Sequence, residues 1–162
     1  MIPIKQIITR KGSGFDAKTW RGFLKKGWLF AGRNWHKVAL PKHFEKSAVD
    51  EYGYQKRTRA HMIRKASKFG HQLPLVFSGR MEREVLRIVD VRETAKMARV
   101  VLHGPPHLHA YRKDLNAPDL AKELKTVSKK DADVVGKDLD KSLIEQDKAE
   151  NKLIDITKGH RR

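Results

Sequence analysis

The sequence predicts an α+β fold, with N-terminal helices, a central antiparallel β-hairpin or small sheet, a C-terminal amphipathic helix and extended terminal arms. Apolar residues recur at helical spacing before residue 70 and after residue 128, and they alternate with polar residues near residue 100. The 162 residues suffice for one domain with a modest core. We therefore expect an N-terminal arm over 1–14, a single α+β domain over 15–146 and a polar tail over 147–162.

The first helix is expected to follow the arm. Asp16 is a suitable N-cap, because its carboxylate can accept hydrogen bonds from the first free main-chain NH groups. Trp20, Trp28 and Trp35 recur at near-helical spacing and predict a helix, which three interrupting glycines weaken. The expected role of these tryptophans is to anchor the core or a subunit interface. Base stacking among the neighbouring lysines and arginines is an open alternative.

Two further helices are expected before residue 70. One begins at Pro41 and ends at Gly53. The other spans residues 55–69 and ends at Gly70. The apolar line of this third helix is expected to consist of Ala60, Ile63, Ala66 and Phe69.

The β-hairpin is expected from residues 83–91 and 96–102, with a polar turn at residues 92–94. Glu82 and Glu84 would then share one face of the first strand as a solvated pair. Residues 107–124 are expected to be a loop with short turns. The last helix should begin at a capping box formed by Ser128 and Asp131, and its apolar stripe consists of Ala132, Val135, Leu139 and Leu143.

Positive charge is concentrated in the first two thirds of the chain. Residues 1–115 hold 25 Lys and Arg against 9 Asp and Glu, whereas residues 116–162 hold 11 against 10. A folded domain with this surplus repels itself unless an anionic partner compensates it. The helix over 55–69 provides the predicted surface for a nucleic acid or an acidic partner, and an ordinary solvated face is the alternative. The residues of this surface are Arg57, Arg59, Arg64, Lys65 and Lys68.

The sequence gives no reason to expect a catalytic site, a cofactor or a metal. The absence of cysteine excludes disulfides and thiolate chemistry. No glycine-rich phosphate loop is present, and no apolar run is long enough to cross a membrane. His103, His107 and His109, with Asp114 nearby, form a metal-like grouping that leaves a metal-dependent nuclease open as an alternative. The alternative to a metal site is a proline-rich loop whose histidines are solvated or stacked at an interface.

The order of features over residues 40–146 resembles one protein family. The stretch Pro-Leu-Val-Phe-Ser-Gly-Arg-Met at 74–81 is similar to the P-x-x-x-[ST]-G-x-[LM] pattern that leads into a β-hairpin in neck and tail-completion (minor tail) proteins of tailed bacteriophages. A hairpin, a proline-containing loop and a closing amphipathic helix follow, as they do in that family. The resemblance implies a non-catalytic virion protein that joins the head connector to the tail.

The same resemblance implies the partners. Copies of the chain would form a homo-oligomeric ring between portal or adaptor proteins and the tail tube or its terminator, with room for sequence-independent contact with packaged DNA. A basic, RNA-bound structural protein of the ribosomal type is the alternative from another class, because its size and charge would be similar. RNase treatment would release such a protein, and metal analysis would test the nuclease alternative.

Overall fold

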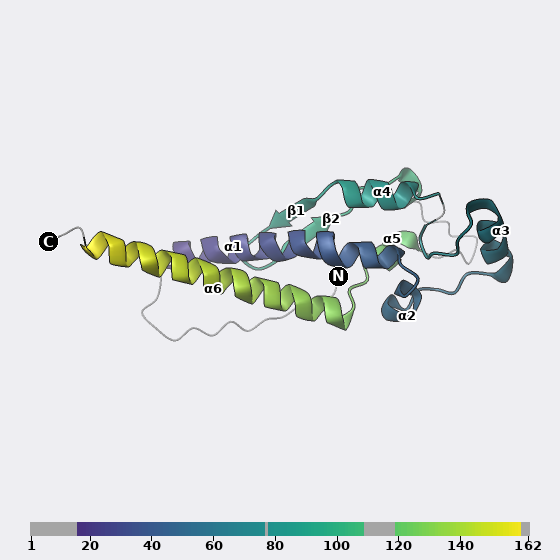
Figure 1. Ribbon diagram of the computed structural model, residues 1–162. Helices are drawn as coiled ribbons and strands as arrows, with labels where there is room; N and C mark the ends of the chain where they lie inside the picture. The colour runs from purple at the N-terminus through teal and green to yellow at the C-terminus, as the bar shows by residue number, and fades with distance from the viewer. Residues whose placement is uncertain (1–15, 77, 109–118, 160–162) are drawn as a thin grey trace.

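Two long antiparallel helices form the frame of this computed structural model (Figure 1). Helix α1 (Ala17–Asn34) lies beside α6 (Lys129–Gly159), and α6 continues beyond the start of α1. The structure describes residues 16–76, 78–108 and 119–159, and it describes the side chains of these residues except for 107 and 151–159. The predicted N-terminal arm over 1–14 lies outside the described residues.

A two-stranded antiparallel sheet covers another side of α1 (Figure 1). Strand β1 (Asp90–Glu93) pairs with β2 (Ala98–Val101), so that Asp90 lies opposite Val101 and Glu93 lies opposite Ala98. Helices with one small antiparallel sheet make an α+β fold, which confirms the predicted fold class.

The short elements gather where α1 ends and α6 begins (Figure 1). The chain leaves α1 through a π-helical turn and a 3-10 helix, and it reaches α3 at the tip of the molecule after α2. It then returns through α4 to the hairpin. These elements are the π-helical turn (Trp35–Ala39), the first 3-10 helix (Leu40–Phe44), α2 (Ala48–Tyr52), α3 (Arg59–Phe69), α4 (Arg80–Arg87), a second 3-10 helix (Pro106–Leu108) and α5 (Leu120–Leu124).

The caps of the two long helices confirm the sequence prediction. Asp16 Oδ1 accepts the main-chain NH of Thr19 at 2.8 Å. At the start of α6, the NH of Asp131 donates to Ser128 Oγ at 3.1 Å, and the NH of Ser128 donates to Asp131 Oδ2 at 3.3 Å. Each of these bonds satisfies a main-chain group that the helix itself leaves unpaired.

The predicted second and third helices are shorter than expected. The 3-10 helix that contains Pro41 ends at Phe44, and α2 begins only at Ala48. Helix α3 begins at Arg59 and not at residue 55, because Thr58 is its N-cap and accepts the NH of His61 at 3.3 Å. Both helices end at the predicted glycines, Gly53 and Gly70, which adopt left-handed backbone conformations.

Most of the first predicted strand is wrong, because residues 80–87 form helix α4. Ser78 and Gly79 therefore lead into a helix and not directly into the hairpin, and Gly79 is the N-cap with φ 71°. Met81 and Val85 are both buried, and their four-residue spacing places them on one helical face. This spacing fits a helix better than the alternation expected of a strand.

The helical conformation also changes the interpretation of the two glutamates. Glu82 and Glu84 lie on different sides of α4, since residues two apart in a helix do not share a face. Glu84 instead accepts a hydrogen bond from Arg80 Nε, one turn earlier, at 2.6 Å. The hairpin turn lies at residues 94–97, later than predicted, where the NH of Thr94 donates to the carbonyl of Met97 at 2.8 Å.

Helix α6 crosses the predicted boundary between domain and tail. It continues through residue 147 to Gly159, so the C-terminal segment is helical over most of the range expected to be an extended arm. Its predicted apolar stripe is largely confirmed, because Val135, Leu139 and Leu143 are buried in the core.

Two glycines of α1 allow the neighbouring elements to approach closely. A Cβ atom on Gly27 would lie 2.7 Å from Leu139 Cδ1 of α6. A Cβ atom on Gly32 would lie 2.8 Å from Val91 Cγ1 of β1. Both distances are shorter than carbon atoms tolerate, so a side chain at either position would have to displace the packed Leu139 or Val91 side chain or move the neighbouring element away from α1.

We predict that Gly27→Val lowers the free energy of unfolding by about 1–3 kcal/mol more than Gly22→Val does, because overpacking a core adds strain. Gly22 is a matched control in the same helix, since a Cβ atom there would meet nothing within 4 Å. Urea unfolding followed by circular dichroism measures both variants. Equal effects of the two substitutions would show that contact with α6 does not set the cost, because valine is no worse than glycine in helix propensity.

Candidate anion-binding surface

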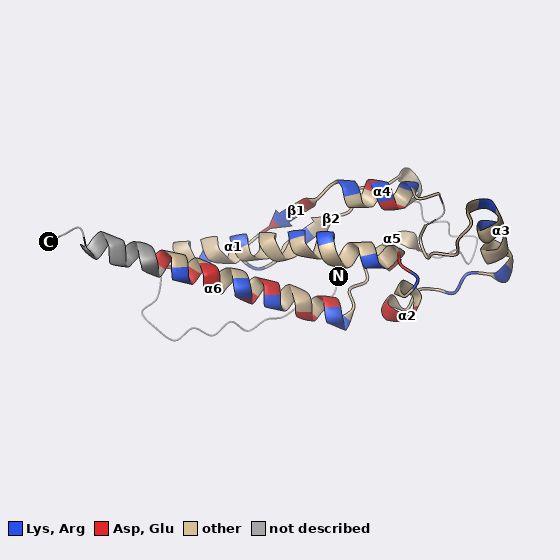
Figure 2. Ribbon diagram, in the orientation of Figure 1, with Lys and Arg blue, Asp and Glu red and all other residues tan. Residues whose placement is uncertain are grey.

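The two longest stretches of the chain without an acidic residue include α1 and α3. Residues 17–44, which include α1, contain seven Lys and Arg, and residues 52–81, which include α3, contain another seven. Figure 2 shows blue positions without red ones on α1 and α3, whereas blue and red alternate along α6. Cations on α1 and α3 therefore lack acidic neighbours on their own helices, and this makes them the candidates for contact with an anion.

Helix α3 presents its cations at the tip of the molecule (Figure 2). The side chains of Arg59, Arg64 and Lys68 are exposed, and Ile63 among them is 58% exposed. Within the described part of the chain, none of these three cations forms an ion pair. We call the exposed side of α3 that carries Arg59, Ile63, Arg64 and Lys68 the tip surface.

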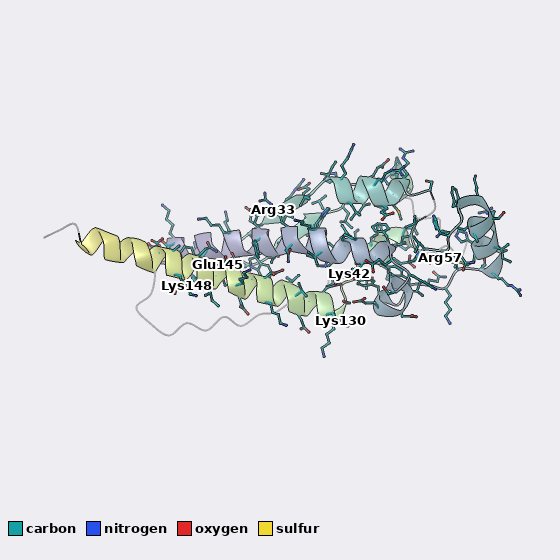
Figure 3. All side chains as sticks on the ribbon, viewed as in Figure 1. Arg33, Lys42, Arg57, Lys130, Glu145 and Lys148 are labelled. Carbon is teal, nitrogen blue, oxygen red and sulfur yellow. The ribbon has the colours of Figure 1, made fainter. Side chains whose placement is uncertain are left out.

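Arg57 does not belong to the tip surface, because it forms a partly buried ion pair with Glu123 of α5. Its Nη1 and Nη2 atoms donate to Glu123 Oε1 at 2.9 Å and Oε2 at 2.6 Å. The same carboxylate accepts the main-chain NH of Gln55 at 3.1 Å. Figure 3 places Arg57 between the frame and α3, so this pair ties the segment that precedes α3 to the rest of the fold.

Lys65 also has an internal role. Its side chain is 4% exposed, and its ammonium group donates to the main-chain carbonyl of Leu73. Burial, together with the charge of Arg57, lowers the pKa of Lys65. The buried side of α3 therefore contains a lysine, whereas Ala60 and Ile63 of the predicted apolar line are exposed.

The three tryptophans contribute to the core to different degrees. Trp35 is 8% exposed, and its ring meets the ring of His43 edge to face at 6.2 Å. Trp20 and Trp28 are partly buried and pack against the core, and Trp20 makes an edge contact with Phe23 at 6.4 Å. Trp20 and Trp28 therefore pack within the fold from α1 and Trp35 from the π-helical turn, and a role at a subunit interface stays a prediction.

A sealed cluster of polar and aromatic side chains lies where the frame meets the tip. The ring of His43 stacks on Tyr52 at 3.8 Å, and His43 Nδ1 forms a hydrogen bond with the hydroxyl of Tyr54. Asp131 at the start of α6 is 1% exposed and acts on the same histidine through its charge. These residues are all buried, so we interpret the cluster as a structural joint that no substrate reaches.

Burial determines the protonation of this joint. It lowers the pKa of His43 to about 4, and the carboxylate of Asp131 opposes only part of the shift. Burial also raises the pKa of Tyr52 and the pKa of Tyr54, with nearby carboxylates adding to both shifts. At neutral pH, His43, Tyr52 and Tyr54 are therefore uncharged.

The metal-like histidine grouping is only partly within the described residues. His103 Nε2 lies 2.9 Å from Asp90 Oδ2 and ties the end of β2 to β1. The side chain of His107, together with His109 and Asp114, lies outside the described side chains. Among the side chains that the structure describes, no three His, Cys, Asp or Glu residues are placed to hold a metal ion.

Together, the fold and its surface define a small basic α+β protein with exposed cationic helices and a closed polar joint. No described helix combines the length and the apolar character needed to cross a membrane. Comparisons with family models, with curated proteins and with solved structures each find no match to this chain.

We predict that stability falls as the pH is lowered through the range from about 6.5 to 4. The pKa of His43 is about 4 in the folded protein and 6.5 as an unperturbed group, so the unfolded chain binds a proton first and acidification favours unfolding. The loss from this residue should reach about 3 kcal/mol near pH 4. Urea unfolding at several pH values should show that the free energy of unfolding depends less on pH in His43→Asn than in the wild type. The same pH dependence in both proteins would exclude His43 as the source.

We also predict that Arg57→Leu lowers the free energy of unfolding by about 3 kcal/mol, because it leaves a buried carboxylate without a counter-charge. Glu123 is only 8% exposed. The double variant Arg57→Leu/Glu123→Leu should recover much of the loss, since neither charge remains. Thermal and urea unfolding measure the stability of both variants. An unchanged free energy of unfolding in Arg57→Leu would contradict a structural role for Arg57.

Proposed function

We propose that this protein is a non-catalytic structural subunit of a tailed-phage virion, a neck or tail-completion protein that forms a ring between the head connector and the tail. The observation that carries the proposal is the tip surface. Three exposed cations without ion-pair partners among the described residues project from the end of an elongated frame. Such a surface suits contact with a polyanion and has no need of sequence readout.

The shape of the subunit supports a ring. A long narrow frame with one distinct tip can repeat around an axis, so that every copy directs its tip to the same side. The contacts between neighbours are then heterologous, and the assembly closes by rotation. With tips directed inward, Arg59, Arg64 and Lys68 of every copy would line a channel through which DNA passes.

The order of elements also supports the proposal. After α4 come the hairpin, the proline-containing segment at residues 104–106 and the closing helix α6. This is the order that the resemblance to neck and tail-completion proteins implies, although helix α4 stands between the Ser78-Gly79 motif and the hairpin. Portal or adaptor proteins on one side, and tail-tube or terminator proteins on the other, are the proposed neighbours.

A charge-reversal experiment tests this proposal. We predict that Arg59→Glu/Arg64→Glu/Lys68→Glu weakens binding to a DNA duplex of about 20 base pairs. The slope of log affinity against log salt concentration should also become shallower by about 2 to 3, since each phosphate contact contributes about 0.9 to it. Lys130→Glu/Lys137→Glu/Lys141→Glu is the matched control. It makes the same charge change at exposed positions of α6. Fluorescence anisotropy over a salt series gives both values.

Negative-stain images of the same preparations, with and without DNA, test the assembly. The proposal predicts closed rings for the wild type and for both variants, because all six substituted side chains are exposed and none belongs to the core. Equal loss of DNA binding in the tip variant and the α6 control would show that the tip surface is not the DNA-binding site. A monomer that prefers RNA to duplex DNA would favour the RNA-bound alternative.

A further inference from the structure

We propose that a groove between the end of α1 and α4 binds an acidic amphipathic helix of a partner protein. This surface is separate from the tip surface, and the inference does not depend on the proposed ring. It rests on three observations: a groove held by a buried hydrogen bond, aliphatic side chains that line it, and a cationic rim. The lining residues are Arg33, His36, Lys37, Pro41, Leu86 and Val89.

The two walls of the groove are held together by a buried hydrogen bond. His36 is 2% exposed, and its Nε2 atom donates to the main-chain carbonyl of Val85 in α4 at 3.2 Å. Val85 itself is fully buried. The turn after α1 and the helix α4 therefore keep a fixed separation, and the groove is part of the folded structure and not a gap between independent segments.

One exposed apolar side chain, that of Val89, lines this groove, and three more belong to residues close in sequence to its lining. Among the described residues, eight large apolar side chains are exposed, and four of them line the groove or lie within three positions of a lining residue. Phe30 is one helical turn before Arg33, so the two share one side of α1. An exposed valine beside the half-buried Pro41 and Leu86 gives the groove an aliphatic lining open to solvent. The four are Phe30 (42% exposed), Val38 (46%), Ile88 (39%) and Val89 (49%).

The rim of the groove is cationic. Arg33 and Lys37 are exposed, and neither forms an ion pair within the described part of the chain. Figure 3 shows Arg33 on the part of α1 that lies next to the hairpin. The acidic residue beside Val89 is Asp90, and its carboxylate is already engaged by His103 at 2.9 Å. A partner that neutralises this rim must therefore supply its own carboxylates.

The combination of floor and rim identifies the class of partner. Pro41, Leu86 and Val89 offer aliphatic surface, from which the phosphates and base edges of a nucleic acid gain little. An amphipathic helix places apolar side chains at positions i, i+3, i+4 and i+7, and its acidic side chains flank that row. The apolar row would cover the floor, and the acidic residues would meet Arg33 and Lys37. This arrangement uses every exposed feature of the groove.

A synthetic peptide tests this inference on the full-length protein. The probe is a labelled helix of about 18 residues with leucines in one stripe and glutamates elsewhere. Two control peptides separate the contributions: one scrambles the stripe at equal charge, and the other replaces glutamate by lysine. We expect the acidic striped peptide to bind by fluorescence anisotropy, and we expect the other two to bind at least about tenfold more weakly.

Two groove variants locate the binding site. Val89→Glu removes an exposed apolar contact, and Arg33→Glu/Lys37→Glu reverses the rim. Each should weaken peptide binding by about tenfold or more. The matched controls on α6 are Ile144→Glu, at a side chain that is 54% exposed, and Lys137→Glu/Lys141→Glu. The controls, and the triple variant of the tip surface, should stay within about twofold of the wild type. Circular dichroism establishes that each variant is folded.

Hydrogen exchange gives a readout that needs no substitution. Bound peptide should slow exchange in residues 30–41 and 84–91. Protection confined to other segments, equal binding of the scrambled peptide, or equal losses in groove and control variants would each falsify the inference. Displacement of the peptide by duplex DNA at matched charge would assign the groove to a nucleic acid instead.

Discussion

The close approach of α6 to α1 is the constraint on which the rest of the structure depends. Leu139 and Leu143 lie against the part of α1 that has no side chain at Gly27, and these two helices make the most extensive contact in the fold. The hairpin approaches α1 in the same way, because Val91 lies against Gly32. Because α1 has no side chain at Gly27 and Gly32, both α6 and the hairpin pack closely against it, even though the apolar fraction of the chain is modest.

The tip depends on a second, polar constraint. One partly buried ion pair and the hydrogen bond of a buried lysine hold the segments before and after α3. Arg57 reaches Glu123 of α5, and Lys65 reaches the carbonyl of Leu73. Two of the seven cations between residues 52 and 81 are thus used inside the protein, and three others, Arg59, Arg64 and Lys68, are exposed on the helix that these bonds position.

Local signals predicted much of the fold, and their limits are physical. Asp16, Ser128 and the glycines after α2 and α3 act through neighbouring main-chain groups, so the sequence alone identifies them. Residues 83–91 were predicted as a strand, whereas residues 80–87 form α4. So short a segment contains few apolar positions, and the burial of Met81 and Val85, which identifies the helical face, is known only from the fold.

The candidate site shows the same limit. Charge predicted that α3 is basic, but it could not separate Arg57 and Lys65 from Arg59, Arg64 and Lys68, because their internal partners lie as far away as Glu123. The groove was not predicted at all, since its two walls are some 50 residues apart and meet through His36 and Val85. The net charge of the sequence shows only that cations are in excess. Only the fold shows that Arg59, Arg64 and Lys68 lie together on α3 at the tip, whereas Arg33 and Lys37 flank an apolar groove beside α4. The two surfaces differ in chemistry, and this is why we propose a different class of partner for each.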